Sequence, residues 1–244
     1  MALSSDQILI NLNNVQRRIA SAAQSAGRNR HDIKLVAVTK KQPAEVIRAL
    51  PPDLVGILGE NYVGNTQQKQ KELCEAAKQF QWHLIGALQS RKVKYVPSLF
   101  ACMHSLDRLS IARRLDREFS QQQDRLPVLL QINIAKEPTK SGWVLDPEQP
   151  SSDILAEIDE VVHLPNLWIQ GLMCMPPYSL NPENSRPHFM AMKKVQALFA
   201  SHFPACDFSE LSMGTSIDFE VAVQEGATFV RIGERIFGKR ENHV

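Results

Sequence analysis

The sequence is short of the features that mark membrane, secreted and metal-binding proteins. It contains no run that approaches the roughly 20 apolar residues needed to cross a bilayer, and residues 1–7 show no positive patch followed by an apolar core. The 4 cysteines stand far apart without a CxxC pair, and the 7 histidines form no HxH or HExxH pattern. We therefore expect no signal peptide, no membrane partner, no metal site, and reduced, buried thiols in a cytoplasmic protein.

An excess of charge of one sign is also missing. The 28 lysines and arginines against 26 aspartates and glutamates give a formal net charge of +2, and basic doublets such as Arg113-Arg114 and Lys239-Arg240 are isolated. Such doublets are typical of a solvated surface, so nothing predicts a nucleic-acid partner. Hydrophobic residues make up 43% of the 244 positions, which is enough for the core of one large domain or two small ones.

What the sequence does contain is a regular alternation of two kinds of segment. An amphipathic helix over residues 6–26 comes first, with a capping-box start at Ser4 and Gln7 and a stop at Gly27. After it, short apolar runs alternate with helical patterns to the end of the chain. The predicted strands cover residues 34–39, 54–58, 82–85, 100–104, 128–134, 168–173, 208–211 and 228–232.

Eight such units predict the α/β class and a single (β/α)8 TIM barrel preceded by an extra helix. Strands separated by helices imply parallel pairing, and a barrel of this type usually takes about 250 residues. A doubly wound open sheet is the competing architecture. We prefer the barrel because the count is eight and no GxGxxG follows the first strand. The chain ends soon after the last strand, so we expect one domain over residues 1–244.

The ends of the seventh and eighth strands carry the pattern of a phosphate site. Barrels place their active sites at the carboxyl ends of the strands and often hold a phosphate with the last two loops. Ser212, Gly214, Thr215 and Ser216 offer hydroxyls and a glycine where a helix begins, and Gly233 follows the neighbouring strand. The hydroxyls alone are explained equally well as helix caps, but together with Gly233 they favour a phosphate.

The first strand ends in two adjacent lysines. A lysine at the inner top of a barrel is desolvated, which lowers its pKa and suits Schiff-base chemistry. Strand alternation puts Lys40 on the same face as Val36 and Val38, and Lys41 on the other face. Because both faces are apolar, alternation does not choose between them, and most lysines are solvated surface residues.

Two further polar residues stand at strand ends. Arg231 lies in an apolar strand and needs a partner, either a carboxylate such as Glu60 or Asp218 or the ring nitrogen of a ligand. Asn61 follows the second strand, where it can orient a ligand hydroxyl or cap the next helix. The residues themselves leave both choices open.

In combination and order, these motifs resemble the YggS/PROSC family of pyridoxal phosphate homeostasis proteins. The resemblance runs from about residue 10 to residue 240, with departures at Ala87, Arg91 and Thr215. It rests on the segments VAVTK (36–40), GENYV (59–63), WHLIG (82–86), LQS (88–90), QINI (131–134), KSG (140–142), GLM (171–173), LSMG (211–214), VRIG (230–233) and IFG (236–238).

The resemblance implies a barrel similar to the N-terminal domain of bacterial alanine racemase, with pyridoxal 5′-phosphate (PLP) as cofactor. It assigns the Schiff base to Lys40, the pyridine nitrogen to Arg231, and a place near the ring to Asn61. The resemblance also assigns the phosphate to the loop that holds Ser212, Gly214, Thr215 and Ser216, together with Gly233.

The residues favour binding over catalysis. Arginine keeps its proton, so a pyridine nitrogen facing Arg231 stays unprotonated and is a weaker electron sink, although racemases of this type also use arginine there. A racemase needs a second acid or base, which the two-domain racemases take from a second domain. Of the 3 tyrosines, only Tyr62 and Tyr178 fall near the top face. We therefore expect no catalytic residues and a carrier role in PLP homeostasis and amino-acid and keto-acid balance.

Three other functions remain open. The first is a PLP-dependent amino-acid racemase. The second is a Schiff-base aldolase, which uses the same lysine and phosphate site without a cofactor and has Glu60 as its best acid or base. The third is a regulatory module that acts on a partner protein. Besides PLP, we expect apo-enzymes that require PLP as partners, and a lone barrel favours a monomer. The loop over residues 176–184 is either a lid or a long connection.

Overall fold

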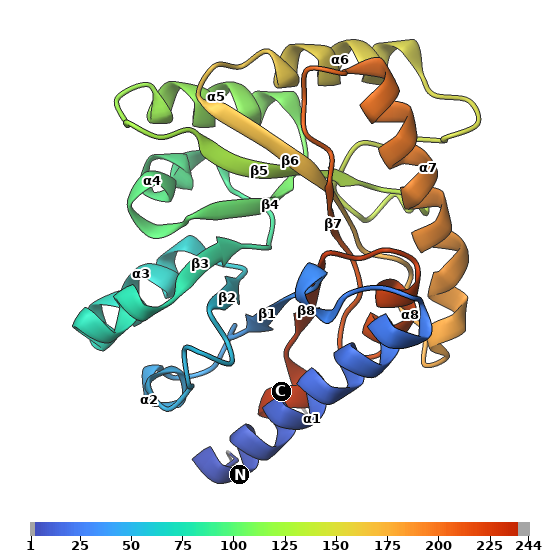
Figure 1. Ribbon diagram of the computed structural model, residues 1–244. Helices are drawn as coiled ribbons and strands as arrows, with labels where there is room; N and C mark the ends of the chain where they lie inside the picture. The colour runs from blue at the N-terminus through green and yellow to red at the C-terminus, as the bar shows by residue number, and fades with distance from the viewer. Residues whose placement is uncertain (1–2, 239–244) are drawn as a thin grey trace.

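The described chain closes into a barrel. The computed structural model describes residues 3–238, and within them eight parallel strands are hydrogen-bonded in chain order, with the last strand beside the first (Figure 1). The predicted (β/α)8 barrel is confirmed. The strands are β1 (Lys34–Val38), β2 (Ile57–Glu60), β3 (Gln81–Leu84), β4 (Cys102–Leu106), β5 (Leu126–Ile132), β6 (Leu167–Cys174), β7 (Glu210–Ser212) and β8 (Phe229–Ile232).

Helical segments connect the strands and cover the outside of the barrel (Figure 1). The α-helices are α1 (Ser5–Ser25), α2 (Ala44–Arg48), α3 (Val63–Leu73), α4 (Val96–Leu99), α5 (Leu109–Phe119), α6 (Ser152–Val162), α7 (Arg186–His202), α8 (Phe219–Gln224) and α9 (Glu234–Phe237). The 3₁₀ helices are η1 (Arg30–Asp32), η2 (Cys74–Gln79), η3 (Ser90–Tyr95) and η4 (Pro182–Ser185). The doublet Lys239-Arg240 lies outside the described residues.

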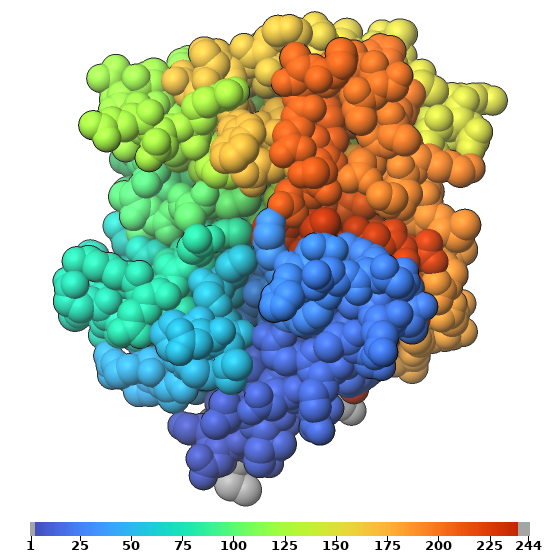
Figure 2. Space-filling model, in the orientation of Figure 1, coloured from blue at the N-terminus to red at the C-terminus, as the bar shows by residue number. Residues whose placement is uncertain are grey.

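The extra N-terminal helix α1 forms as predicted and packs against α8 and α9. Figure 2 shows its blue residues lying against the red residues of the C-terminal segments. Its cap is half of the expected box, because Ser4 Oγ accepts from the Gln7 N–H at 3.2 Å while the Gln7 side chain donates to Asn11 Oδ1 instead. Asn11 Nδ2 also donates to the carbonyl of Ile236 at 3.0 Å. This bond ties the first helix to the last.

Several predicted strand bounds shift by one to three residues in the structure, and two segments show why local chemistry changes an element. The N–H groups of Leu54 and Val55 both donate to the Pro51 carbonyl, so a turn occupies these positions and β2 begins three residues later than predicted and ends at Glu60. The helical segment between β3 and β4 begins as the 3₁₀ helix η3, and an α-helix starts only at Val96. Pro97 fits there because proline is tolerated in the first turn of an α-helix but not in its interior.

The cysteines are all free thiols in the described chain, as expected. Cys102 and Cys174 are buried, whereas Cys74 is exposed and Cys206 is partly exposed. The expectation that all four are buried is therefore wrong. Cys74 is exposed because it ends α3 with a φ of +52° at the surface.

None of the helices within residues 3–238 has both the length and the apolar character that a bilayer crossing requires.

The side chains of β1 alternate between two cores. Val36 and Val38 pack inside the barrel with Phe229, whereas Leu35 and Ala37 pack in the main core between the strands and the helices. The even-numbered positions of β1 therefore face the barrel interior, and the first lysine of the doublet continues that side of the strand.

Candidate functional site

A pocket of about 330 Å³ opens at the carboxyl ends of the strands. Two of the eight residues that we predicted as ligands, Ser212 and Gly214, do not line it. The six predicted residues that the structure brings together around it are Lys40, Asn61, Thr215, Ser216, Arg231 and Gly233. Residues at the carboxyl ends of β1, β2 and β8 and from the loop after β7 thus meet in one place, as the barrel topology requires.

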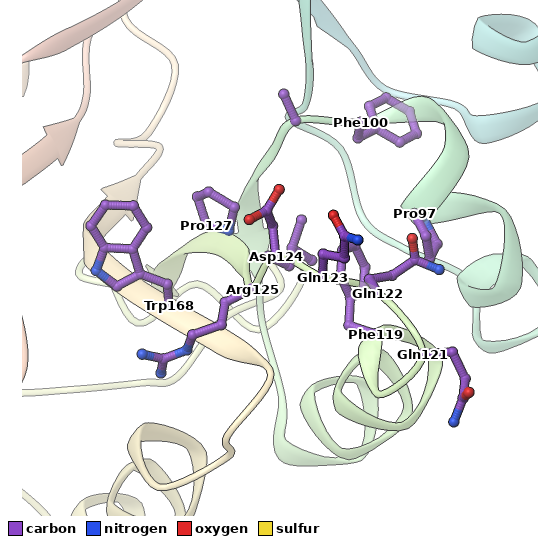
Figure 3. Close-up of a pocket in the computed structure, with 12 residues that line it drawn as sticks. Pro97, Phe100, Phe119, Gln121, Gln122, Gln123, Asp124, Arg125, Pro127 and Trp168 are labelled. Atoms are coloured by element: carbon purple, nitrogen blue, oxygen red, sulfur yellow. The ribbon is translucent and has the colours of Figure 1, made fainter.

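A larger hollow of about 930 Å³ lies at the amino ends of the strands, beside Trp168 at the start of β6 (Figure 3). Arg125 and Asp124 stand at its wall, and no lysine lines it. Because barrel enzymes use the carboxyl face, and because Schiff-base chemistry needs an amine, the smaller pocket is the candidate site.

The structure separates the two lysines of the doublet. Lys40 is half-buried and lines the pocket together with Val38. Lys41 is exposed, does not line the pocket, and has a φ of +65°. The turn is closed by the Gln42 N–H, which donates to the Thr39 carbonyl at 2.9 Å. This turn directs the second lysine away from the site.

A buried ion pair supports the strand end that carries Lys40. Glu60 is 0% exposed and pairs with Lys69 of α3. Thr39 Oγ1 donates to Glu60 Oε1 at 2.7 Å, and Lys69 Nζ donates to the Thr39 carbonyl at 2.6 Å. Glu60 does not line the pocket, so it is placed neither to pair with Arg231 nor to act as the acid or base of an aldolase. Nothing in the local pattern had singled out Lys69.

Arg231 forms part of the pocket wall and is 4% exposed. Its Nη1 donates to Ser212 Oγ at 2.6 Å and its Nη2 to the Cys174 carbonyl at 2.9 Å. Burial lowers its pKa, with Asp218 acting in the opposite direction. Within residues 3–238 it forms no ion pair with a carboxylate, which was the first of the two alternatives for its partner.

The polar groups of the loop after β7 have different hydrogen-bond partners. Thr215 donates from both its N–H and its hydroxyl to Asp218 Oδ1, at 2.7 and 3.0 Å, which is a local turn contact. Ser216 Oγ accepts from the N–H groups of Gly233 and Arg235, at 3.3 and 3.4 Å. The N–H groups of Ser216 and Ile217 make no hydrogen bond to the described chain. Backbone donors from two adjacent loops therefore gather at one end of the pocket.

The two predicted residues outside the pocket have structural roles. Ser212 is 0% exposed and its hydroxyl is engaged by Arg231 below the pocket floor. Gly214 has a φ of +89°, and a Cβ there would lie 2.5 Å from the Cβ of Ala222 in α8. Only glycine lets the loop pass this closely to the helix.

Asn61 presents a buried acceptor to the pocket. Its Oδ1 is shielded from solvent and has no hydrogen-bond partner in the described chain. The alternative of a helix cap is wrong, because α3 starts at Val63 and its capping residue is Tyr62, which makes no side-chain cap bond. A Cβ on Gly86 would lie 2.6 Å from the Asn61 carbonyl oxygen, so this glycine lets the Asn61 backbone lie against the next strand end.

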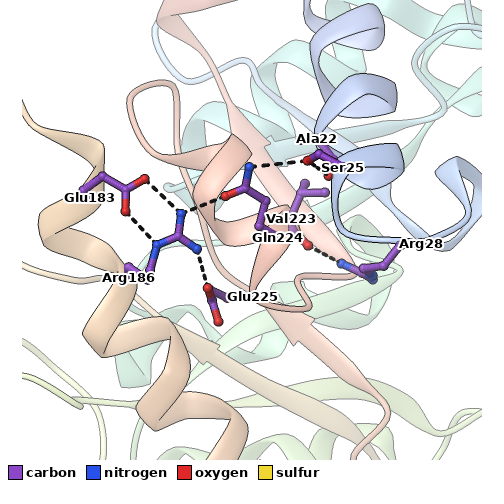
Figure 4. Close-up of polar contacts among 8 residues, drawn as sticks. All are labelled: Ala22, Ser25, Arg28, Glu183, Arg186, Val223, Gln224 and Glu225. Carbon is purple, nitrogen blue, oxygen red and sulfur yellow. Dashed lines mark hydrogen bonds and ion pairs between the residues drawn. The ribbon is translucent and has the colours of Figure 1, made fainter.

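Both ends of the loop after β6 are tied down. Lys140 Nζ donates to the Met175 and Pro176 carbonyls at 3.1 and 2.8 Å. At the other end Arg186 binds Glu183 and also donates to Gln224 Oε1 of α8 at 2.8 Å (Figure 4). Between these ties Tyr178 lines the pocket although it is 80% exposed. The loop is thus held at both ends beside the pocket, and both alternatives, a lid and a long connection, stay open.

The fold and the pocket define a single barrel of the alanine racemase N-terminal domain type, and the model of that domain family matches residues 10–241. The chain belongs to this family and, within it, to the pyridoxal phosphate homeostasis proteins, as its relatives show. One from Aquifex aeolicus is 37% identical over 231 residues, 94% of this chain and 97% of that one. One from Pseudomonas aeruginosa is 38% identical over 231 residues, 95% of each chain. One from Escherichia coli K12 is 37% identical over 245 residues, 97% of this chain and 98% of that one.

Solved structures agree with this membership. PipY from Synechococcus elongatus PCC7942, with PLP bound, is 32% identical and superposes with a TM-score of 0.76 over 92% of this chain and 100% of its own. An alanine racemase from Clostridium difficile 630 is 15% identical with a TM-score of 0.70, over 98% of this chain and 58% of its own. The second likeness shows the fold alone.

Proposed function

We propose that this protein binds PLP in the pocket at the carboxyl face and holds it as a Schiff base on Lys40. The observation that carries this proposal is the meeting of Lys40, Asn61, Arg231 and the loop donors around one cavity. The relatives named pyridoxal phosphate homeostasis protein and the PLP-bound PipY support it. The pocket of about 330 Å³ lies within the range of about 300–1,000 Å³ typical of small-molecule sites.

The residues present fit the chemical groups of PLP. The unpartnered Asn61 Oδ1 needs a donor, which the ring hydroxyl supplies. The N–H groups of Ser216 and Ile217, which have no partner in the described chain, suit a phosphate, and they lie beside the Gly233 and Arg235 N–H groups that donate to Ser216 Oγ. The Lys40 amine condenses with the aldehyde with loss of one water, and hydrolysis of the same bond releases the aldehyde again.

The protein would act as a carrier rather than as an enzyme. Its relatives are named as homeostasis proteins, and Arg231 retains its own proton toward a ring nitrogen. We also propose that residues 1–244 form one PLP-binding domain, that the protein is a monomer in the cytoplasm, and that apo-enzymes requiring PLP are its partners. The single closed barrel of the described chain supports the first of these points.

The direct test is an absorbance spectrum of the purified protein after addition of PLP, before and after borohydride. We expect a visible band that borohydride bleaches, and a reduced PLP label on the peptide that contains Lys40. A protein that stays colourless with PLP present would remove the proposal. A trappable adduct with a sugar phosphate would then favour the aldolase, although Glu60 is not positioned to serve it.

Asn61→Leu separates binding from stability. The substitution removes an acceptor that lacks a partner in the protein, so without PLP we expect unchanged or slightly raised thermal stability. PLP affinity should fall about tenfold, because one buried hydrogen bond worth about 1.5 kcal/mol is lost. Titration of the visible band measures the PLP affinity, and a melting curve measures the thermal stability. Asn61→Asp keeps an oxygen acceptor and serves as the control; equal affinity of wild type and Asn61→Leu would contradict the assignment.

Tyr178 decides whether the racemase alternative survives, because it is the one tyrosine among the residues that line the pocket in the described chain. We expect the PLP-loaded protein to exchange the Cα proton of L-alanine in D₂O no faster than free PLP does. Tyr178→Phe should then change neither this rate nor PLP affinity, since the side chain is largely in solvent. Proton NMR of the alanine measures the exchange. Exchange that is fast in the wild type and lost in Tyr178→Phe would identify a racemase.

A further inference from the structure

A line of polar side chains crosses the apolar interior of the barrel. His83 of β3 and His104 of β4 are joined by a contact of 2.8 Å between Nδ1 and Nε2, respectively. The other ring nitrogen of His104, Nδ1, lies 2.8 Å from Ser212 Oγ, which also accepts from Arg231. All four residues are at most 4% exposed. We call this set the His83–Arg231 chain.

The positions of the protons in this chain follow from donor and acceptor counting. Arginine only donates, so Ser212 Oγ accepts from Arg231. The hydroxyl has one proton to give, and only the arrangement in which His104 Nδ1 accepts it leaves that proton with an acceptor in the chain. His104 then carries its proton on Nε2 and donates it to His83 Nδ1. Every hydrogen bond points the same way, from Arg231 inward, and such chains strengthen cooperatively.

The surroundings keep both imidazoles neutral, as this direction requires. Burial lowers the pKa of His83 to about 3, with Lys34 adding to the effect. Burial likewise holds the pKa of His104 well below its usual value, together with the facing His83, Arg231 and Lys34. The Phe229 ring packs against both imidazoles, at centroid distances of 5.9 and 4.8 Å. No physiological pH reverses the chain by protonating a ring.

We propose that the His83–Arg231 chain positions the guanidinium of Arg231 on the pocket floor and blocks proton supply from below. Ser212 fixes one terminal nitrogen and the Cys174 carbonyl fixes the other, so the guanidinium plane is held at two points. The neutral imidazoles have no acidic proton to pass on to a ring nitrogen of a bound ligand. The proposal deepens the proposed PLP function, on which its ligand part rests. His83, His104 and Ser212 are positioning residues, since none of them lines the pocket.

A metal ion is the competing explanation for this cluster. Among residues 3–238, ligand atoms of His83, His104 and Cys102 lie within 4.8 Å of one another. However, the facing nitrogens of the two rings already bond each other, and the second nitrogen of His104 bonds Ser212. A bound metal would have to break the hydrogen-bond chain.

The first arm of the test needs no ligand and no variant. Nitrogen-15 NMR of histidine-labelled full-length protein without PLP should show both buried imidazoles as neutral rings protonated on Nε2, unchanged from pH 5 to 8. Titration of either ring in this range, or an Nδ1-protonated form of either, would overturn the proposal. So would a stoichiometric zinc content by elemental analysis, with metal-shifted imidazole signals.

The second arm measures the positioning effect. Ser212→Ala removes the link between Arg231 and His104, and we expect its PLP dissociation constant to rise about tenfold and the His104 signals to shift. Ser212→Thr keeps the hydroxyl and should restore both. Thr66→Val, which removes a buried hydroxyl in α3 outside the chain, should change neither. An unchanged dissociation constant in Ser212→Ala would refute the positioning role. If the wild type bound no PLP, the proposed function would fail while the first arm still tested the chain.

Discussion

Replacing Lys40 by alanine should abolish the visible band and weaken PLP binding by about 100-fold, equivalent to about 2.8 kcal/mol. The reason is that the remaining contacts are hydrogen bonds and apolar packing, whereas the amine of Lys40 is the pocket group that can bond covalently to the aldehyde. Absorbance titration gives the dissociation constant, and mass spectrometry after borohydride shows whether a label remains. Thermal stability without PLP should change little, because the side chain is only half-buried.

The matched control is Lys41→Ala. This neighbour has the same chemistry, but it is exposed and does not line the pocket. It should keep the band and an affinity within about twofold of the wild type. A label that persisted at full yield in Lys40→Ala, or a loss of the band in Lys41→Ala, would show that the wrong member of the doublet had been assigned.

The alternation of segments was enough to predict the barrel. Eight apolar runs separated by helical patterns have few other ways to bury both faces of a parallel sheet. Local turn chemistry was harder to see. Leu54 and Val55 look like the start of a strand, but two bonds to the Pro51 carbonyl hold them in a turn. Apolar character alone does not distinguish a buried turn from a buried strand.

The site was predictable where sequence position along a strand decides location. Lys40 and Arg231 stand at strand ends, so the topology alone brings them to one face. The direction in which a side chain points could not be predicted in the same way. Ser212 looked like a phosphate ligand, but it ends β7 on the inward side and its hydroxyl is consumed by Arg231 and His104.

Contacts across the barrel could not be predicted from the sequence. His83 and His104 are separated by 21 positions, and only the register of β3 and β4, which pairs His83 with Cys102, puts the rings in contact. Glu60 of β2 and Lys69 of α3 form a second such contact, between a strand and a helix, that the sequence did not reveal. Charged residues were expected to find partners, but the identity of each partner depends on distances that spacing along the chain does not give.

Lys69→Met should be the most destabilising of the substitutions considered, lowering the free energy of unfolding by about 3–5 kcal/mol. The variant leaves the carboxylate of Glu60 fully buried with one hydroxyl donor, Thr39 Oγ1, in place of an ion pair. An uncompensated buried charge is costly because the protein interior solvates it poorly. Urea unfolding measures the change. Affinity for PLP should fall as well, since Lys69 also holds the Thr39 carbonyl next to Lys40.

Two further variants isolate the cause. Lys78→Met breaks an exposed ion pair with Glu75 and should have little effect, because such pairs contribute little in water. Adding Glu60→Gln to Lys69→Met removes the buried charge and should recover much of the lost stability. If the double variant were as unstable as Lys69→Met alone, the loss would come from the packing of the lysine stem in α3 rather than from the stranded carboxylate. The ion pair would then be a consequence of the fold at this strand end and not one of its supports.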